Sequence, residues 1–166
     1  MNLFEYALKM ELDGEQYYSN LAEQAQYEDL KKVFRSLAED EQRHYKIILA
    51  VQNETADKLK ENPLFNTVQN VFAMNVKPSK DNPELIARLK NEQIDVYRAA
   101  LEKEKESVAL YSKLRGELTG QAEIAICTSL MQEEEKHVEV IDNLIDMLNH
   151  VNDWVESAEF NHQDVY

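Results

Sequence analysis

The sequence predicts an all-α protein, a four-helix bundle made of two helical hairpins that are joined by one long crossover. Only three glycines and three prolines occur in 166 residues, and 30% of the residues are charged. A β-rich fold would need far more turn-forming residues. Apolar residues also recur at alternating steps of three and four along four segments, as in helices that pack along a seam.

The four helices are expected as two sequential pairs. The predicted ranges are about 2–26, 28–60, 91–117 and 121–149. Short turns near 26–28 and 119–120 would close residues 2–60 and 91–149 into two hairpins. Together they form one domain over residues 1–150, and residues 151–166 are expected as a C-terminal tail.

Residues 61–90 are predicted to be the crossover between the hairpins. This segment contains all three prolines and is too long for a hairpin turn, but it can run the length of a bundle. Five of its apolar residues are expected to form a short helix over an open face: Leu64, Phe65, Val68, Val71 and Phe72.

Charge and composition exclude several classes of partner. A net charge of −14 provides no basic face for nucleic acid. No run of 18 apolar residues could span a membrane, and acidic residues interrupt any signal-peptide core at the N-terminus. The single cysteine, Cys127, permits neither an internal disulfide nor a Cys-x-x-Cys site, so we expect a cytoplasmic protein.

The two hairpins are copies of one pattern. A shift of 93 residues aligns them without a gap, and the matched positions are largely seam positions. The identical pairs include Ala7 and Ala100, Glu11 and Glu104, Tyr18 and Tyr111, Leu37 and Leu130, Glu41 and Glu134, His44 and His137, and Ile48 and Ile141. We therefore expect the hairpins to pack as a pseudo-twofold pair.

Six seam positions carry charged or titratable side chains instead of apolar ones: Glu11, Glu41, His44, Glu104, Glu134 and His137. Unpaired buried carboxylates are unfavourable by several kcal/mol, so such a group requires a partner. Two divalent cations would balance four carboxylates and two neutral histidines. One glutamate from each of two helices, with Glu-x-x-His from the other two, is the ligand set of a dinuclear carboxylate site. The alternative is a buried, protonated carboxylate–histidine network without metal.

At these positions the chain resembles the ferritin-like superfamily, and in particular the rubrerythrin-like diiron proteins. The resemblance covers about residues 3–150 and rests on MELDGEQYYSNLA, AEDEQRHYKII, LEKEKESVALYSKL and MQEEEKHVEVI. It implies that Glu11 and Glu104 are terminal ligands, that Glu41 and Glu134 bridge two metals, and that His44 and His137 each bind one. It also implies iron, although this ligand set would accept manganese or zinc.

Two features depart from the family pattern. Full-length rubrerythrins add a Cys-x-x-Cys rubredoxin domain, which these residues do not contain. Classical members also carry an extra glutamate one turn after the third-helix ligand. That position is Ser107 here, and Gly14 is its counterpart on the first helix. Small residues at both places could leave room for dioxygen or peroxide.

Several neighbouring residues have two interpretations. Tyr18 and Tyr111 could hydrogen-bond ligating carboxylates from a facing helix, or they could be ordinary core tyrosines. Asp40 and Glu133 could orient a histidine of the partner hairpin, or they could lie on a solvated face. For mutagenesis, we expect Glu133 and Glu135 to be exposed.

The leading functional hypothesis is an oxidoreductase that reduces hydrogen peroxide or dioxygen. Its electrons would come from a separate, rubredoxin-like donor, and a homodimer is compatible with this role. A second hypothesis is an iron-binding ferroxidase that buffers or stores Fe(II). The third is a structural bundle in which metal only holds the hairpins together.

Overall fold

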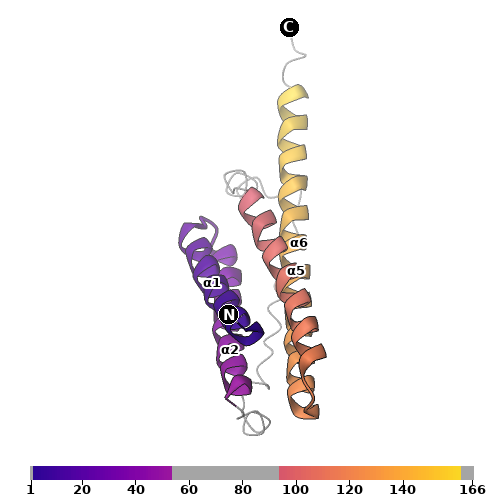
Figure 1. Cartoon of the computed structure of the whole chain (residues 1–166). Coiled ribbons are helices and arrows are strands. Elements are labelled where there is room, and N and C mark those ends of the chain that lie inside the picture. Colours follow the sequence, from indigo (N-terminus) through magenta and orange to yellow (C-terminus); the bar gives the residue numbers. More distant parts are fainter. Residues whose placement is uncertain (1, 54–93, 162–166) are drawn as a thin grey trace.

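The computed structural model describes residues 2–53 and 94–161, which contain four α-helices and no strand (Figure 1). The helices are α1 (Leu3–Gln24), α2 (Glu28–Gln52), α5 (Ile94–Glu117) and α6 (Gln121–Asn161). The predicted all-α four-helix class is therefore confirmed. The predicted crossover, residues 61–90 with their short covering helix, lies entirely outside the described residues.

The helices form two antiparallel hairpins that lie side by side. Packing is most extensive within the pairs α1–α2 and α5–α6, and α1 meets α5 and α2 meets α6 between the hairpins. Figure 1 shows the hairpins as two distinct columns. The centre of the bundle is therefore formed by residues that meet between the two hairpins.

Local sequence explains where the first hairpin begins, at the start of α1, and where it ends, at the end of α2. Asn2 and Glu5 form a capping box, in which Asn2 Oδ1 accepts from the Glu5 amide at 2.9 Å and Glu5 Oε2 accepts from the Asn2 amide at 2.8 Å. Helix α2 ends at Gln52, with Asn53 as its C-cap, so the predicted end near residue 60 was wrong. The buried apolar positions of α2 stop at Val51, and a polar segment, NETADKLKEN, follows.

Helix α6 is longer than predicted. It continues past residue 149 to Asn161, and its C-terminal part extends beyond the other described helices (Figure 1). No glycine or proline interrupts residues 121–161, and Val151 continues the buried seam at 4% exposure. The tail expected from residue 151 is thus helical up to Asn161, and residues 162–166 lie outside the described range.

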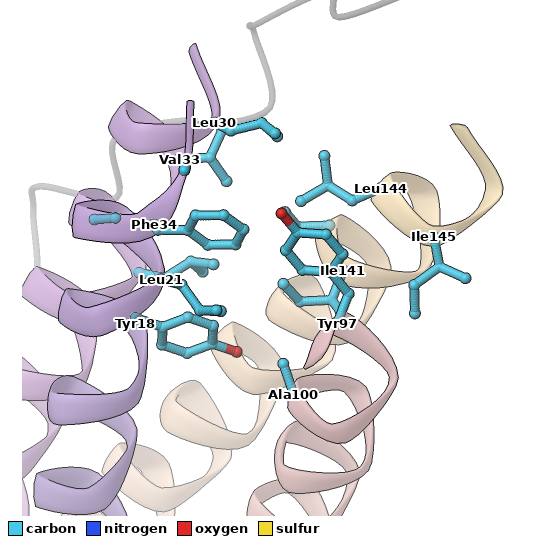
Figure 2. Close-up of a cluster of buried hydrophobic side chains, with 14 of the residues drawn as sticks. Tyr18, Leu21, Leu30, Val33, Phe34, Tyr97, Ala100, Ile141, Leu144 and Ile145 are labelled. Atoms are coloured by element: carbon cyan, nitrogen blue, oxygen red, sulfur yellow. The ribbon is translucent and has the colours of Figure 1, made fainter. Parts of the chain in front are cut away.

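Aromatic rings join the hairpins at one end of the bundle. Phe34 of α2 stacks on Tyr97 of α5 with ring centres 5.4 Å apart, and on Tyr18 of α1 at 6.3 Å (Figure 2). All three side chains are almost fully buried. A second apolar cluster, which includes Ile47, Tyr111 and Cys127, occupies the other end. The six charged or titratable seam residues therefore lie between two apolar layers.

Replacement of Phe34 by alanine should test the stacked layer. We expect the free energy of unfolding to fall by about 3–5 kcal/mol, because the ring fills a closed site between the hairpins. Leu12→Ala is the control, since Leu12 is 46% exposed, and it should change stability by less than about 0.5 kcal/mol. Urea unfolding of both variants, without metal, measures the difference. An equal loss of stability in the two variants would contradict the role of Phe34 in joining the hairpins.

Candidate metal centre

The structure brings all six predicted seam residues together in the middle of the bundle. Each helix contributes to the group: Glu11 from α1, Glu41 and His44 from α2, Glu104 from α5, and Glu134 and His137 from α6. None is more than 4% exposed. Because residues three apart lie on one face of a helix, each Glu-x-x-His pair points in one direction.

The six side chains form two overlapping groups of four. One group is Glu11, Glu41, His44 and Glu134, and the other is Glu41, Glu104, Glu134 and His137. Within each group, one potential ligand atom per residue lies within 4.8 Å of the others. Glu41 and Glu134 belong to both groups. This overlap is the arrangement that two neighbouring cations with two shared carboxylates would require.

The histidines direct their Nδ1 atoms at the carboxylates. His44 Nδ1 lies 2.8 Å from Glu134 Oε1 and 3.5 Å from Glu11 Oε2. His137 Nδ1 lies 3.3 Å from oxygens of Glu41 and Glu134, and 3.5 Å from Glu104 Oε2. The two imidazole rings are stacked with centres 5.6 Å apart. Both rings therefore face the same small volume.

Several buried polar atoms in this volume make no contact with hydrogen-bond geometry, although His44 Nδ1 and Glu134 Oε1 are within ion-pair distance of each other. They are Glu11 Oε2, both carboxylate oxygens of Glu134, and the Nδ1 atoms of His44 and His137. Native proteins rarely leave buried polar atoms unpaired. Oxygen and imidazole nitrogen are good ligands for divalent transition metals. The unpaired atoms consequently fit a metal site in both donor chemistry and direction.

Burial and mutual repulsion control the charges of the metal-free group. Burial raises the pKa of Glu41 well above its usual value, and repulsion from Glu134 adds to this. Burial likewise raises the pKa of Glu104 to about 7. Burial alone would lower the pKa of both histidines, but the carboxylates around them, Glu134 for His44 and Glu104 for His137, raise it well above normal. Without metal, the group therefore retains protons that a cation would have to displace.

Two tyrosines connect each hairpin to a glutamate of the other. The Tyr18 hydroxyl donates to Glu104 Oε1, and the Tyr111 hydroxyl donates to Glu11 Oε1. Burial raises both tyrosine pKa values well above normal, with the carboxylates adding to the effect. The hydroxyls are therefore neutral donors, and each fixes the orientation of one carboxylate.

A second polar layer holds the outer nitrogens of the histidines. His44 Nε2 lies 2.9 Å from Glu133 Oε2, and His137 Nε2 lies 3.3 Å from Asp40 Oδ2. Both contacts connect α2 to α6. The expectation that Glu133 is exposed was wrong, because its contacts leave it only 9% exposed. The alternative interpretation, in which Asp40 and Glu133 orient the histidines, agrees with this geometry. Glu135 is exposed as expected.

Arg43 joins the two carboxylates of this second layer. Its guanidinium donates to Glu133 at 2.5 and 3.3 Å and to Asp40 at 2.8 Å. Burial alone would raise the pKa of Glu133, but hydrogen bonds from His44 and Arg43 lower it to about 2. Sequence reasoning missed Arg43. The available signal was its position directly before His44, in a chain with 18 basic and 32 acidic residues.

Arg43 also breaks the pseudo-twofold symmetry. The shift of 93 residues pairs Arg43 with Lys136 and Asp40 with Glu133. Lys136, however, is exposed. One buried cation thus serves both halves of the second layer.

Comparison with known proteins agrees with these observations. The family model described as Rubrerythrin matches residues 2–145. No curated protein and no solved structure matches the chain. Within the described residues, no helix is both long and apolar enough to cross a membrane.

Substitution of Arg43 by glutamine should destabilise the metal-free protein. Asp40 and Glu133 would lose their buried cation, and we expect the free energy of unfolding to fall by roughly 3 kcal/mol. Lys136→Gln removes the same charge at the pseudo-equivalent, exposed position, and should change stability by less than about 0.5 kcal/mol. Chemical denaturation at neutral pH compares the two variants. A similar, small effect in both would show that the Arg43 contacts do not stabilise the bundle.

Proposed function

The chain belongs to the rubrerythrin family, and from this premise we propose that it is a diiron oxidoreductase that reduces hydrogen peroxide or dioxygen. The observation that carries the proposal is the pair of four-residue groups that share Glu41 and Glu134. Their unpaired atoms face one volume, and family membership favours iron over manganese or zinc.

In this proposal each metal has one histidine and one unshared glutamate. Glu11 and His44 would hold the first metal, Glu104 and His137 the second, and the two shared carboxylates would lie between them. Four carboxylates balance two divalent charges when both histidines are neutral. The tyrosine contacts to Glu11 and Glu104, together with the Asp40 and Glu133 contacts to the histidines, would restrict ligand movement.

Two bound ferrous ions would supply the two electrons that, with two protons, convert one hydrogen peroxide into two waters. The chain's own part is to hold the ligands and to exclude bulk water from the centre. We propose that Tyr18 and Tyr111 lie next to the ligands and each keep a proton on the hydroxyl oxygen. They donate to Glu104 and Glu11 in the absence of metal.

The electrons for repeated turnover are proposed to come from a separate donor protein, such as a rubredoxin-like one. Cys127 is the single cysteine of these 166 residues. It is fully buried, and burial raises its thiol pKa to about 11. A buried, protonated thiol is a poor redox group.

Metal titration tests the site directly. We expect about two ferrous ions per chain, with fewer in Glu41→Ala and Glu134→Ala, because each variant removes a shared carboxylate. Glu135→Ala is the control, since Glu135 is exposed. Affinity should weaken as pH falls, because the histidine pKa values are raised and protons then compete for Nδ1. Anaerobic calorimetry measures both quantities. Wild-type protein that binds no metal would leave the protonated network as the correct interpretation.

Stopped-flow mixing of the anaerobically reduced protein with peroxide tests the reaction. One iron pair holds two electrons, so we expect one peroxide consumed rapidly per chain and sustained turnover only with an added rubredoxin and its reductase. Dioxygen, mixed in the same way, should react more slowly. Fast dioxygen consumption with ferric mineral in a shell-like oligomer would indicate iron storage instead. Bound metal that does not undergo redox change would indicate a structural role.

A further inference from the structure

A pocket of about 140 Å³ between α1 and α5 reaches the candidate metal centre. Glu41 and Glu104 form part of its lining, together with Gly14, Tyr18 and Ser107. Two other grooves, one between α1 and α2 and one near the start of α1, include none of the six clustered residues. The α1–α5 pocket therefore connects the surface to the carboxylates.

Small residues keep the inner end of this pocket open. Gly14 and Ser107 are equivalent under the 93-residue shift and stand on opposite walls. A Cβ atom at Gly14 would lie 3.3 Å from both Cγ and Cδ of Glu41. Any larger side chain there would press on Glu41 itself. Ser107 lies one helical turn after Glu104, so its side chain projects on the same face as that glutamate.

The opposite side of the centre is closed. There the histidine Nε2 atoms meet Asp40 and Glu133, which Arg43 bridges. On the pocket side, the Tyr17 hydroxyl donates to the Val96 carbonyl at 2.7 Å, which joins α1 to α5 beside the pocket. Among the described residues, the pocket that reaches the cluster therefore lies between α1 and α5, where Glu41 and Glu104 form part of its lining.

The pocket can select by size more readily than by charge. At about 140 Å³ it is well below the roughly 300–1,000 Å³ of pockets for drug-sized ligands. Lys9 and Lys103 are offset by Asp13 and Glu106 around it, and Lys9 pairs with Asp13 at 3.8 Å. Neither sign of charge dominates the entrance.

We propose that this pocket is the entry route for the oxidant and that Gly14 and Ser107 determine its width. The pocket admits molecules of the size of hydrogen peroxide and excludes bulky organic hydroperoxides. The proposal rests on the proposed function and adds the route and the size class of the substrate.

Nitric oxide binding to the anaerobic, Fe(II)-loaded protein tests the route without any turnover. Ser107→Leu should fill the pocket and lower the association rate at least about tenfold, while the iron stoichiometry stays at the wild-type value. Ser107→Ala removes the hydroxyl without adding volume and should not lower the rate. Ser19→Leu adds the same bulk in the α1–α2 groove and should also leave it unchanged. Wild-type rates in Ser107→Leu would overturn the proposal.

A reversible block guards against misfolding of the leucine variant. Ser107→Cys can be folded and then treated with methyl methanethiosulfonate, which adds a methylthio group. Cys127 should not react, because it is fully buried and its thiol pKa is raised to about 11. Nitric oxide association should slow after modification and recover after treatment with dithiothreitol and its removal. An unchanged rate on modification would exclude this route.

The oxidant test separates this proposal from the proposed function. Reduced wild-type protein should react with hydrogen peroxide at least about 100-fold faster than with cumene hydroperoxide. Equal rates would overturn the size limit. If neither peroxide reacts and dioxygen does not react either, the proposed function fails, but the nitric oxide rates still decide the route. Protein that binds no iron would overturn both.

Discussion

Four carboxylates and two imidazoles packed into the buried centre of the bundle are the constraint on which the rest of the structure depends. Apolar layers at both ends, including the Phe34 stack, shield this centre from bulk water. Because the groups are buried, each charge must be neutralised by a proton, by a facing side chain or by a cation. In the metal-free chain, bound protons provide part of this neutralisation, because the pKa values of Glu41 and both histidines are raised. The atoms without a hydrogen-bond partner face one volume and would suit neutralisation by a cation.

Around this centre, one buried cation organises a second layer. Arg43 contacts Asp40 and Glu133, and each of these carboxylates contacts a histidine of the opposite hairpin. The inner group is nearly symmetric, but this layer is not, because the equivalent of Arg43 is the exposed Lys136. The two proposed metal positions therefore have different electrostatic surroundings, although their nearest side chains are of the same types.

The inner group was predictable because local periodicity and the internal repeat specify it. Glu11, Glu41 and His44, with their counterparts, occupy seam positions in otherwise apolar patterns. The second layer depends instead on contact between α2 and α6, which periodicity within one helix does not describe. Glu133 lies beside the seam, and its burial results from Arg43 and His44. The ends of α2 and α6 were also predicted wrongly. Helix α2 ends earlier than predicted, just after its last buried apolar residue, Val51. Helix α6 continues further than predicted, because Val151 is buried in the segment that was expected to be a tail.

The polar contacts described above for Tyr18, Tyr111 and the two histidine Nε2 atoms all cross from one hairpin to the other. Tyr18 reaches Glu104 and Tyr111 reaches Glu11, while His44 reaches Glu133 and His137 reaches Asp40. One hairpin alone would hold each donor without its acceptor. Two copies of the same hairpin, paired about a twofold axis, would contain the complete set. The fold is thus compatible with an origin in a dimer of a single hairpin, made covalent by duplication and fusion, in which Arg43 marks later divergence of the halves.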